Sequence, residues 1–395
     1  MLWAAVALAA GTAGAVIGAR GERGGDEAAA ADTAKLPPGR PLTLVWGGDL
    51  TLGSSYGLPP GNARGLLAAV APTMRRADVT AVNLEGTLGA GGASKCPPRG
   101  APDCFAFQAP AANAAALPRA GVDVVNLANN HAWDFGALGM GQTVNALRAQ
   151  RVRFTGRPGE IAYSDLEGAR VAFLGFSSYP WTSPIRDLVA VRRLVRQAAR
   201  NANVVVVFMH AGAEGARQTR TPLGEEEAFG EQRGNVRAFA HTAVDAGADL
   251  VLGSGPHVLR GIEVYRGRAI AYSLGNLAGY KNFARGGPLS LSGLLRVTIA
   301  ADGALTGGRL VPLELVGAGV PVLDRRHAAV RLVAGVSGLD FGRRAVRLSP
   351  SGRIVGPPAP PPKPPPTTTT PSTTAPPVTA PATATVPAAG SSATP

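Results

Sequence analysis

Five short apolar runs in this chain each end in a residue type that binds metal ions or transfers protons. The polar residues at the ends of these runs are Asp49, Asn83 with Glu85, Asn129 with Asn130 and His131, His210, and His257. A short run of Val, Leu and Ile flanked by Gly or Asn is typical of a strand buried on both faces. Because ligand sites gather at the carboxyl ends of such strands, the runs predict an α/β fold with oxygen and nitrogen ligands for a metal ion at one rim.

The segments between these runs have helix-forming composition and apolar spacing. The expected helices are Ala63–Arg75, Ala111–Ala120, Ala137–Gln150, Arg186–Asn201 and Asn235–Ala246. Gly121 and Gly247 stand where two of them would end. Further on, GIEVYRGRAIAYS and LSGLLRVTIAADGALTGGRLVPLEL are typical of β-hairpins. The sequence therefore predicts a mixed α/β core that finishes with antiparallel strands.

The two ends of the chain differ in composition from its middle. Residues 1–19 hold an uncharged Ala/Gly-rich stretch that suits a signal peptide or an N-terminal membrane anchor, and residues 20–40 resemble a polar linker. Residues 356–395 are mainly Pro, Thr, Ala and Ser, which predicts a disordered tail. We expect an exported protein, extracellular or membrane-anchored and facing the outside. A cytosolic chain is the alternative, because basic residues follow the apolar stretch instead of preceding it.

The charge and the cysteines bear on partners and compartment. The net charge of +13 comes from scattered arginines that form no stripe with interleaved aromatic residues, so no nucleic-acid partner is expected. An anionic surface polymer or its precursor would be a natural partner for this positive field. Cys96 and Cys104 are the two cysteines, and in an exported protein they are expected to close a small disulfide loop. In the cytosol they would be two free thiols.

The first two strand ends offer oxygen ligands. Asp49 follows two glycines and is a weak signal alone, because Asp also caps helices and shapes turns. Asn83 and Glu85 are two positions apart and therefore point to the same side of an extended chain. The alternative for Glu85 is a loop carboxylate paired with an arginine.

The remaining strand ends add imidazole groups. Asn130 offers a carbonyl oxygen, and His131 beside it can protonate a leaving group near neutral pH, with Asp134 as its orienting partner. His210 leaves a four-valine run and precedes Glu214 by four residues, while His257 lies in a Gly/Pro loop. The alternatives are a polar helix cap for the Asn-Asn-His segment and a buried, hydrogen-bonded histidine for His210.

In order, GGDLTLG, NLEGTLG, NLANNHAWDFG, HAGAEG and GSGPHVLRGIEVYRGRAIAYSLGN resemble the bacterial capsule-synthesis family (CapA, poly-γ-glutamate biosynthesis type) over about residues 41–300. The resemblance implies a calcineurin-like metallophosphoesterase fold, which is a four-layer α/β/β/α sandwich. It also implies that Asp49, Asn130, His210 and His257 are metal ligands. Glu85, or Asn83, would take the bridging position. His131 would be the general acid, and Glu214 matches the family's His-x-Gly-x-Glu segment.

Two positions depart from the pattern. Thr51 stands where phosphoesterases carry a histidine in the first motif, and Ser254 with Gly255 stand where the last motif commonly has another histidine. Both changes remove nitrogen ligands. The cofactor expected is a divalent metal (Mn²⁺, Mg²⁺ or Zn²⁺), with one hard ion such as Mn²⁺ or Mg²⁺ better supported than two transition metals.

The predicted function is the synthesis or processing of a capsule or poly-γ-glutamate-type surface polymer at a metal-dependent hydrolase site. The capsule-synthesis domain would span residues 41–315, and residues 316–355 would form a small appendage. One alternative is a non-catalytic polymer-binding or scaffold subunit of a membrane-linked synthesis complex. Another is a secreted nucleotide or nucleic-acid phosphoesterase, for which the scattered arginines are a weak argument.

Overall fold

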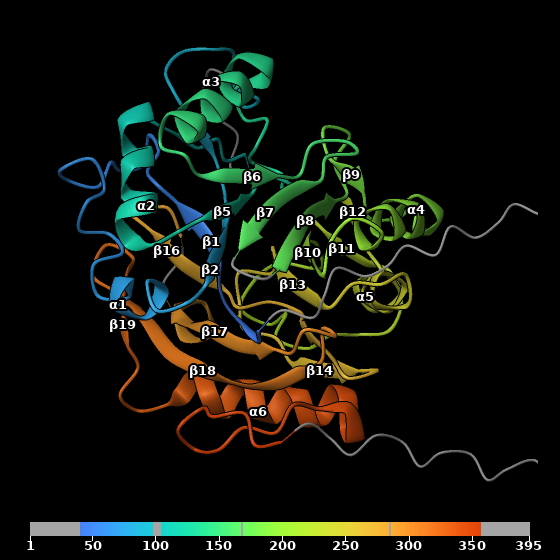
Figure 1. The fold of residues 1–395 in the computed structure, drawn as a ribbon. Coiled ribbons are helices and arrows are strands. Elements are labelled where there is room, and N and C mark those ends of the chain that lie inside the picture. The colour runs from blue at the N-terminus through green and yellow to red at the C-terminus, as the bar shows by residue number, and fades with distance from the viewer. Residues whose placement is uncertain (1–39, 98–103, 167–168, 284–285, 357–395) are drawn as a thin grey trace, which may run out of the picture. The chain divides into compact units, whose positions relative to one another are not determined.

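Two β-sheets lie face to face at the centre of the computed structural model (Figure 1), which describes residues 40–97, 104–166, 169–283 and 286–356. The first sheet has eight strands. Its order is β19 (Val320–Leu323), β18 (Leu305–Val316), β17 (Leu291–Ile299), β1 (Leu42–Thr51), β2 (Val79–Leu84), β5 (Val124–Asn126) and β6 (Arg153–Thr155), with β16 (Asn276–Gly279) paired to β1. The strands β1, β2, β5 and β6 are parallel, and β17 to β19 are antiparallel.

The second sheet has seven strands. Its order is β14 (Ile262–Tyr265), β15 (Arg268–Ala271), β13 (Leu250–Ser254), β10 (Val204–His210), β8 (Ala169–Ser177) and β7 (Ala162–Leu166), with β9 (Ser183–Pro184) paired to β8. Two small ribbons complete the strands, namely β3 (Thr87–Leu88) with β4 (Gln108–Ala109) and β11 (Glu226–Ala228) with β12 (Glu231–Gly234). The hairpins expected from the sequence are β14 with β15 and β17 with β18.

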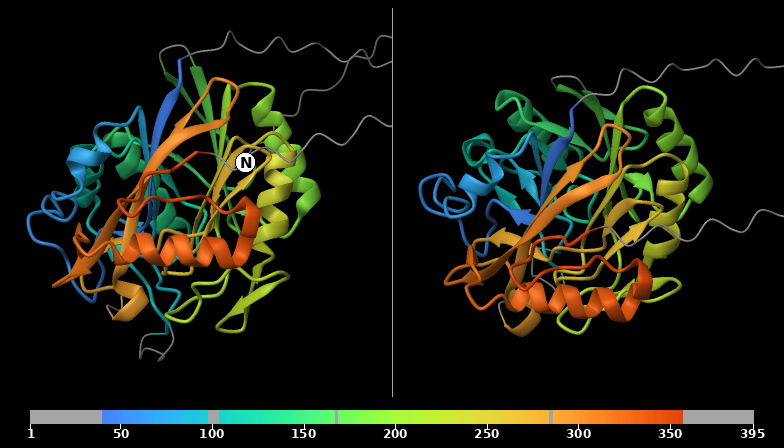
Figure 2. Two further views of the ribbon diagram at one scale, coloured as in Figure 1. Left: turned by 90° about the horizontal axis from the view of Figure 1, so that it is seen from below. Right: turned by 60° about the horizontal axis from the view of Figure 1, so that its bottom comes forward.

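Three apolar cores hold four layers together. Trp46 of β1, Phe173 of β8 and Phe208 of β10 lie in the core between the sheets, where the rings of Trp46 and Phe208 stack 5.0 Å apart. Fully burying aromatic side chains of this size is among the largest single contributions to a core. The outer face of the first sheet packs on α1 (Ala71–Met74), α2 (Ala116–Ala120) and α3 (Gly136–Ala149). The outer face of the second sheet packs on α4 (Leu188–Ala199) and α5 (Val236–Asp245). This is the four-layer α/β/β/α sandwich predicted from the sequence, and Figure 2 shows its layers from below.

The helices differ from expectation mainly at one place. Only Ala71–Met74 of the segment 63–75 is α-helical, and residues 61–70 form successive turns. Pro72 explains the difference, because a proline lacks the N–H that a helix interior requires and is tolerated only in the first turn. In the segment 111–120, a 3₁₀ helix (Ala111–Ala115) precedes α2. Gly121 ends α2 in a left-handed conformation, as predicted.

The segment expected to be a small appendage, residues 316–355, packs onto the main body. The strand β19 extends the first sheet beside β18, and α6 (Ala328–Phe341) buries Ala329, Val330 and Val333 in the core between the sheets. Cys96 and Cys104 form a disulfide bond, which confirms the closed loop expected from the sequence. Within the described residues, none of the helices has the length and apolar character needed to span a bilayer. The predicted signal peptide or anchor, the linker and the Pro/Thr-rich tail lie outside the described residues, apart from the last residue of the linker and the first of the tail.

Candidate metal centre

The carboxyl ends of five strands meet where the two sheets face each other. The strands β1, β2 and β5 belong to the first sheet, and β10 and β13 belong to the second. The side chains predicted to share one rim therefore come from two sheets, not from one. Asp49 lies in β1 beside a register shift, and such a bulge redirects the side chains next to it. Gly48 allows this turn of the backbone, since its φ is +78° and a Cβ there would lie 2.4 Å from the carbonyl oxygen of Gly275.

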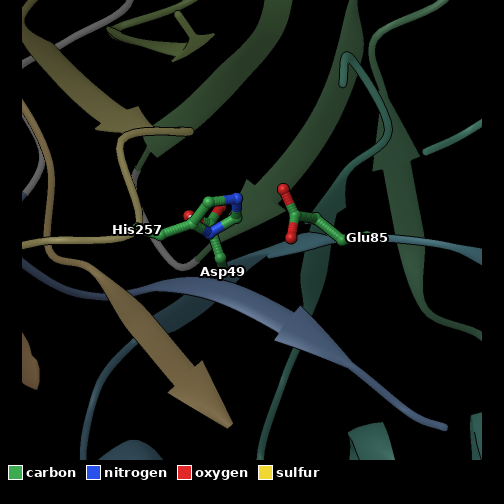
Figure 3. A group of neighbouring side chains, drawn as sticks. All are labelled: Asp49, Glu85 and His257. Atoms are coloured by element: carbon green, nitrogen blue, oxygen red, sulfur yellow. The ribbon is translucent and has the colours of Figure 1, made fainter. Parts of the chain in front are cut away.

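Asp49, Glu85 and His257 form a compact cluster (Figure 3), in which one ligand atom of each lies within 4.8 Å of the others. His210 completes it, because its Nδ1 lies 3.7 Å from Oδ1 of Asp49 and its Nε2 lies 3.5 Å from Oε1 of Glu85. His257 takes a left-handed backbone conformation (φ 59°), which is uncommon for a non-glycine residue. Four residues of types that bind divalent metals thus converge from four separate strand ends.

Asparagine side chains hold this cluster in place. The amide of Asn83 donates to Oδ1 of Asp49 at 2.8 Å and lies 3.1 Å from Nδ1 of His210. Its Oδ1 accepts hydrogen bonds from Asn126 and Asn129, at 2.9 and 3.1 Å. Asn83 therefore orients Asp49 and His210, and its oxygen is already used. The bridging position that the resemblance offered to Glu85 or Asn83 is better filled by Glu85.

Several polar atoms of the predicted site residues are buried without a hydrogen-bond partner among the described residues. They are both carboxylate oxygens of Glu85, Nε2 of His210 and Oδ1 of Asn130. An unpaired buried polar group costs about 1–3 kcal/mol, and more when it is charged. All of these atoms are oxygens or an imidazole nitrogen, which are the donors of divalent cation sites. The residues present therefore fit a bound divalent ion, whose ligands would be Asp49, Glu85, Asn130, His210 and His257.

The electrostatics of the cluster follow from its burial. Burial raises the pKa of Glu85 well above its usual range, and the negative charge of Asp49 adds to this rise. Burial opposes protonation of His257, but the charge of Glu85, a hydrogen bond from His257 to the carboxylate of Asp49, and the charges of Glu214 and Asp49 raise its pKa to about 10. Burial also lowers the pKa of His210 well below its usual value. Because metal ligands bind in their deprotonated forms, a cation at this site would compete with protons for Glu85 and His257.

His131 lies beside this cluster with the partner predicted for it. Its Nδ1 lies 2.8 Å from Oδ2 of Asp134, and its ring stacks on Phe107 with centroids 4.2 Å apart. Asp134 also binds Lys95, at 2.7 Å, and accepts from the backbone N–H of Phe107 at 2.6 Å. Burial lowers the pKa of His131, and the charge of Asp134 opposes that effect. The contact with Asp134 fixes the ring so that Nε2 is left for a substrate.

A pocket of about 560 Å³ opens over the site, and it is lined by His131, Asn130, Glu214, His257 and Asn276 together with aromatic and basic residues. Glu214 lies at its base, with Oε2 3.7 Å from Nε2 of His257 and Oε1 2.7 Å from Nη2 of Arg233. Every site residue predicted from the sequence is therefore at this pocket or directly behind it.

Sequence reasoning missed other residues of the pocket. Oδ1 of Asn276 accepts a hydrogen bond from Nδ1 of His257 at 2.7 Å, and its only signal in the sequence was its place after a glycine at the end of IAYSLGN. Arg233 lies in a charged hairpin that is typical of a solvated surface, and nothing in the sequence marked it. The aromatic lining, including Phe107, Tyr179 and Trp181, likewise carried no recognisable spacing.

The two positions that depart from the phosphoesterase pattern have structural partners. Oγ1 of Thr51 accepts a hydrogen bond from Asn282 at 2.7 Å. Ser254 lies 3.2 Å from Nδ1 of His210 and donates to the carbonyl oxygen of Met209 at 3.3 Å. Both hydroxyl groups contact neighbouring side chains and add no imidazole ligand. The remaining candidate ligands are those that the sequence predicts for a single ion.

A family model described as bacterial capsule synthesis protein PGA_cap matches residues 43–281, more than half of the chain. The chain belongs to this family. The matched residues contain the whole cluster around Asp49 and Glu85. Membership in this family confirms the resemblance drawn from the sequence motifs.

Two curated members of the family are similar to this chain. The capsule biosynthesis protein CapA of Bacillus anthracis is 34% identical over 41% of this chain and 41% of its own length. The PGA biosynthesis protein CapA of Bacillus subtilis is 32% identical over 39% of this chain and 41% of its own length. The chain thus matches about two fifths of the length of each relative. Among solved structures, the calcineurin-like phosphoesterase YfkN of Bacillus subtilis aligns with 76% of this chain and 97% of that chain, at a TM-score of 0.41 and 12% identity.

Proposed function

We propose that this protein is an exported, metal-dependent hydrolase that acts in the synthesis or processing of a capsule or poly-γ-glutamate-type surface polymer. Family membership supports the link to a surface polymer, since relatives are described as capsule and PGA biosynthesis proteins. The disulfide between Cys96 and Cys104 supports export, because such bonds persist in oxidising compartments. The observation that carries the hydrolase proposal is the unpartnered buried carboxylate of Glu85 beside the unpartnered Nε2 of His210.

The residues divide into two roles. Asp49, Glu85, Asn130, His210 and His257 would hold the ion, with Asn83 keeping Asp49 and His210 in position. A bound divalent cation would supply positive charge to polarise the bond that is cleaved. His131 would donate a proton from Nε2 to the leaving group, and Asp134 would hold its ring in the required orientation. Mn²⁺ or Mg²⁺ suits this mainly oxygen-containing ligand set, and Zn²⁺ is also compatible with its imidazoles.

Elemental analysis of the purified full-length chain tests the metal centre. We expect about one Mn²⁺, Mg²⁺ or Zn²⁺ ion per chain, and loss of that ion in Asp49→Ala. His241→Ala is the matched control, because His241 pairs with Glu263 on the far side of the second sheet. Retention of the ion by Asp49→Ala would reject the proposed site.

A non-catalytic polymer-binding or scaffold subunit is the second candidate. Thr51 and Ser254 favour it, because both replace imidazole ligands of active phosphoesterases with hydroxyl groups that have other partners. Such a subunit would bind an anionic polymer, or join a membrane-linked synthesis complex, without cleaving anything. Less than one ion per chain, with no phosphodiester or peptide hydrolysis in added Mn²⁺, would support this candidate over the hydrolase.

A further inference from the structure

A buried arginine faces the pocket next to the proposed metal centre. Arg233, on β12, is 1% exposed and is part of the pocket lining. Its Nη1 donates a hydrogen bond to the hydroxyl of Tyr179 at 2.7 Å. Its Nε and Nη2 have no hydrogen-bond partner among the described residues. These two nitrogens form the edge of the guanidinium that grips a carboxylate or a phosphate by two parallel hydrogen bonds.

One carboxylate of the protein lies close to this edge of the guanidinium without forming aligned hydrogen bonds to its two nitrogens. Oε1 of Glu214 lies 2.7 Å from Nη2 of Arg233, and Oε1 is itself without an aligned hydrogen bond. The other oxygen of Glu214 lies 3.7 Å from Nε2 of His257, at the metal cluster. Glu214 therefore sits between Arg233 and the candidate ion ligands, in the position where an acidic group of a bound substrate would be attracted from both sides.

We infer that Arg233 binds an acidic group of the substrate, a carboxylate or phosphate oxyanion, which displaces Glu214 from the Nε and Nη2 edge. This inference rests on the proposed function, and it adds that the substrate carries an oxyanion next to the bond at the metal centre. The hairpin of β11 and β12 places Arg233 there, because its strands pair from Glu226 to Gly234 and the backbone of Arg233 accepts from the N–H of Gly212. Its tip carries Phe229, which is 72% exposed and lines the same pocket.

Isothermal titration calorimetry of the full-length chain with two probes tests the inference. Inorganic phosphate and glutarate are titrated separately, once with Mg²⁺ and once with EDTA. We expect Arg233→Gln to weaken binding at least tenfold, since it removes both charge and the two-point contact. Arg233→Lys keeps the charge alone and should weaken binding less. Glu214→Gln should bind more tightly than wild type, because the competing carboxylate is gone. The stronger of the two probes identifies the class of oxyanion.

Arg186→Gln is the matched control, because Arg186 is exposed and forms a long ion pair with Glu225, at 3.7 Å. Thermal unfolding checks that each variant is folded. If Arg233→Gln does not fold, the comparison of Arg233→Lys with wild type still tests the inference. Equal binding by wild type and both Arg233 variants, or binding of neither probe by wild type, would overturn the inference. So would weaker binding by Glu214→Gln. Metal content is measured apart from probe binding, so the proposed metal centre and the role of Arg233 can fail separately.

Discussion

Nε2 of His210 lies 3.5 Å from Oε1 of Glu85, and the two residues end strands of different sheets. Neither atom has a hydrogen-bond partner among the described residues. Protein interiors rarely leave such groups unpaired unless a ligand or an ion satisfies them. A cation between the two members would satisfy both atoms, and this has consequences for variants at Glu85.

Glu85→Gln should affect stability with opposite signs in the presence and absence of metal. In EDTA, the variant should be more stable than wild type by about 1–3 kcal/mol, because an unpaired buried carboxylate is removed. In Mn²⁺, wild type should gain stability and the variant should not, because only wild type binds the ion. Thermal unfolding with and without Mn²⁺ measures both effects, with the exposed Glu227→Gln as control. A metal-dependent shift that persists in Glu85→Gln would contradict the ligand assignment.

His131→Ala should abolish hydrolysis while the metal content stays unchanged. His131 stacks on Phe107 and pairs with Asp134, and no ion pair within the described part of the chain joins it to Asp49 or Glu85. Loss of a general acid typically costs a factor of about 10²–10⁴ in rate. Turnover and elemental analysis on the same sample decide the outcome, and equal activity in the variant would refute the role of His131.

Removing the disulfide should lower stability without emptying the metal centre. The bond joins Cys96 to Cys104, and Cys104 lines the pocket. The chain-entropy estimate for a loop of this length is about 2–3 kcal/mol. Urea unfolding of the double variant Cys96→Ser/Cys104→Ser measures the loss, and elemental analysis checks the ion. An unchanged free energy of unfolding would show that the loop is equally constrained without the bond.

Glu263 should make stability depend on pH in the acid range. Burial alone would raise the pKa of Glu263, but a hydrogen bond with His241 at 2.9 Å and one from Tyr272 at 2.8 Å hold it below its usual value of 4.5. A carboxyl group with a lowered pKa stabilises the fold above pH 4.5, and this contribution is lost as the pH falls through the folded-state pKa.

The variant Glu263→Gln therefore should lose about 1.5–3 kcal/mol relative to wild type at pH 7, the usual range for a charged hydrogen-bond partner. The difference should shrink once the pH is well below 4.5. Urea unfolding at several pH values measures it, with the half-buried Glu314→Gln as control. A difference that stays constant from neutral to acid pH would exclude the charge of Glu263 as its cause.

Much of the fold and of the site could be predicted from the sequence, for a physical reason. Buried parallel strands are continuous apolar runs, and their carboxyl ends are where polar side chains are tolerated. Asp49, Glu85, His210 and His257 were therefore visible as candidates before their distances were known. The division of the five strands between two sheets was not visible, because strand pairing is decided by contacts far apart in the chain.

Three differences between the sequence predictions and the structure have identifiable causes, one local and two that depend on contacts far apart in the chain. Pro72 shortens the first expected helix, and a stricter use of the proline rule would have predicted this. The spacing predicts Asn83 as a ligand candidate, but its oxygen accepts hydrogen bonds from Asn126 and Asn129, a network that spacing cannot reveal. Arg233 was missed because a hairpin rich in charged residues is usually exposed, whereas tertiary contacts bury this one.

The candidate ion ligands come from both sheets, with Asp49 and Glu85 on one side and His210 and His257 on the other. A cation bound between them would tether the two halves of the sandwich to each other. Since binding to the folded form alone shifts the folding equilibrium, the amount of intact protein would then follow the concentration of that cation around it. A shortage of the cation would then lower the amount of folded protein as well as leave the candidate metal centre empty.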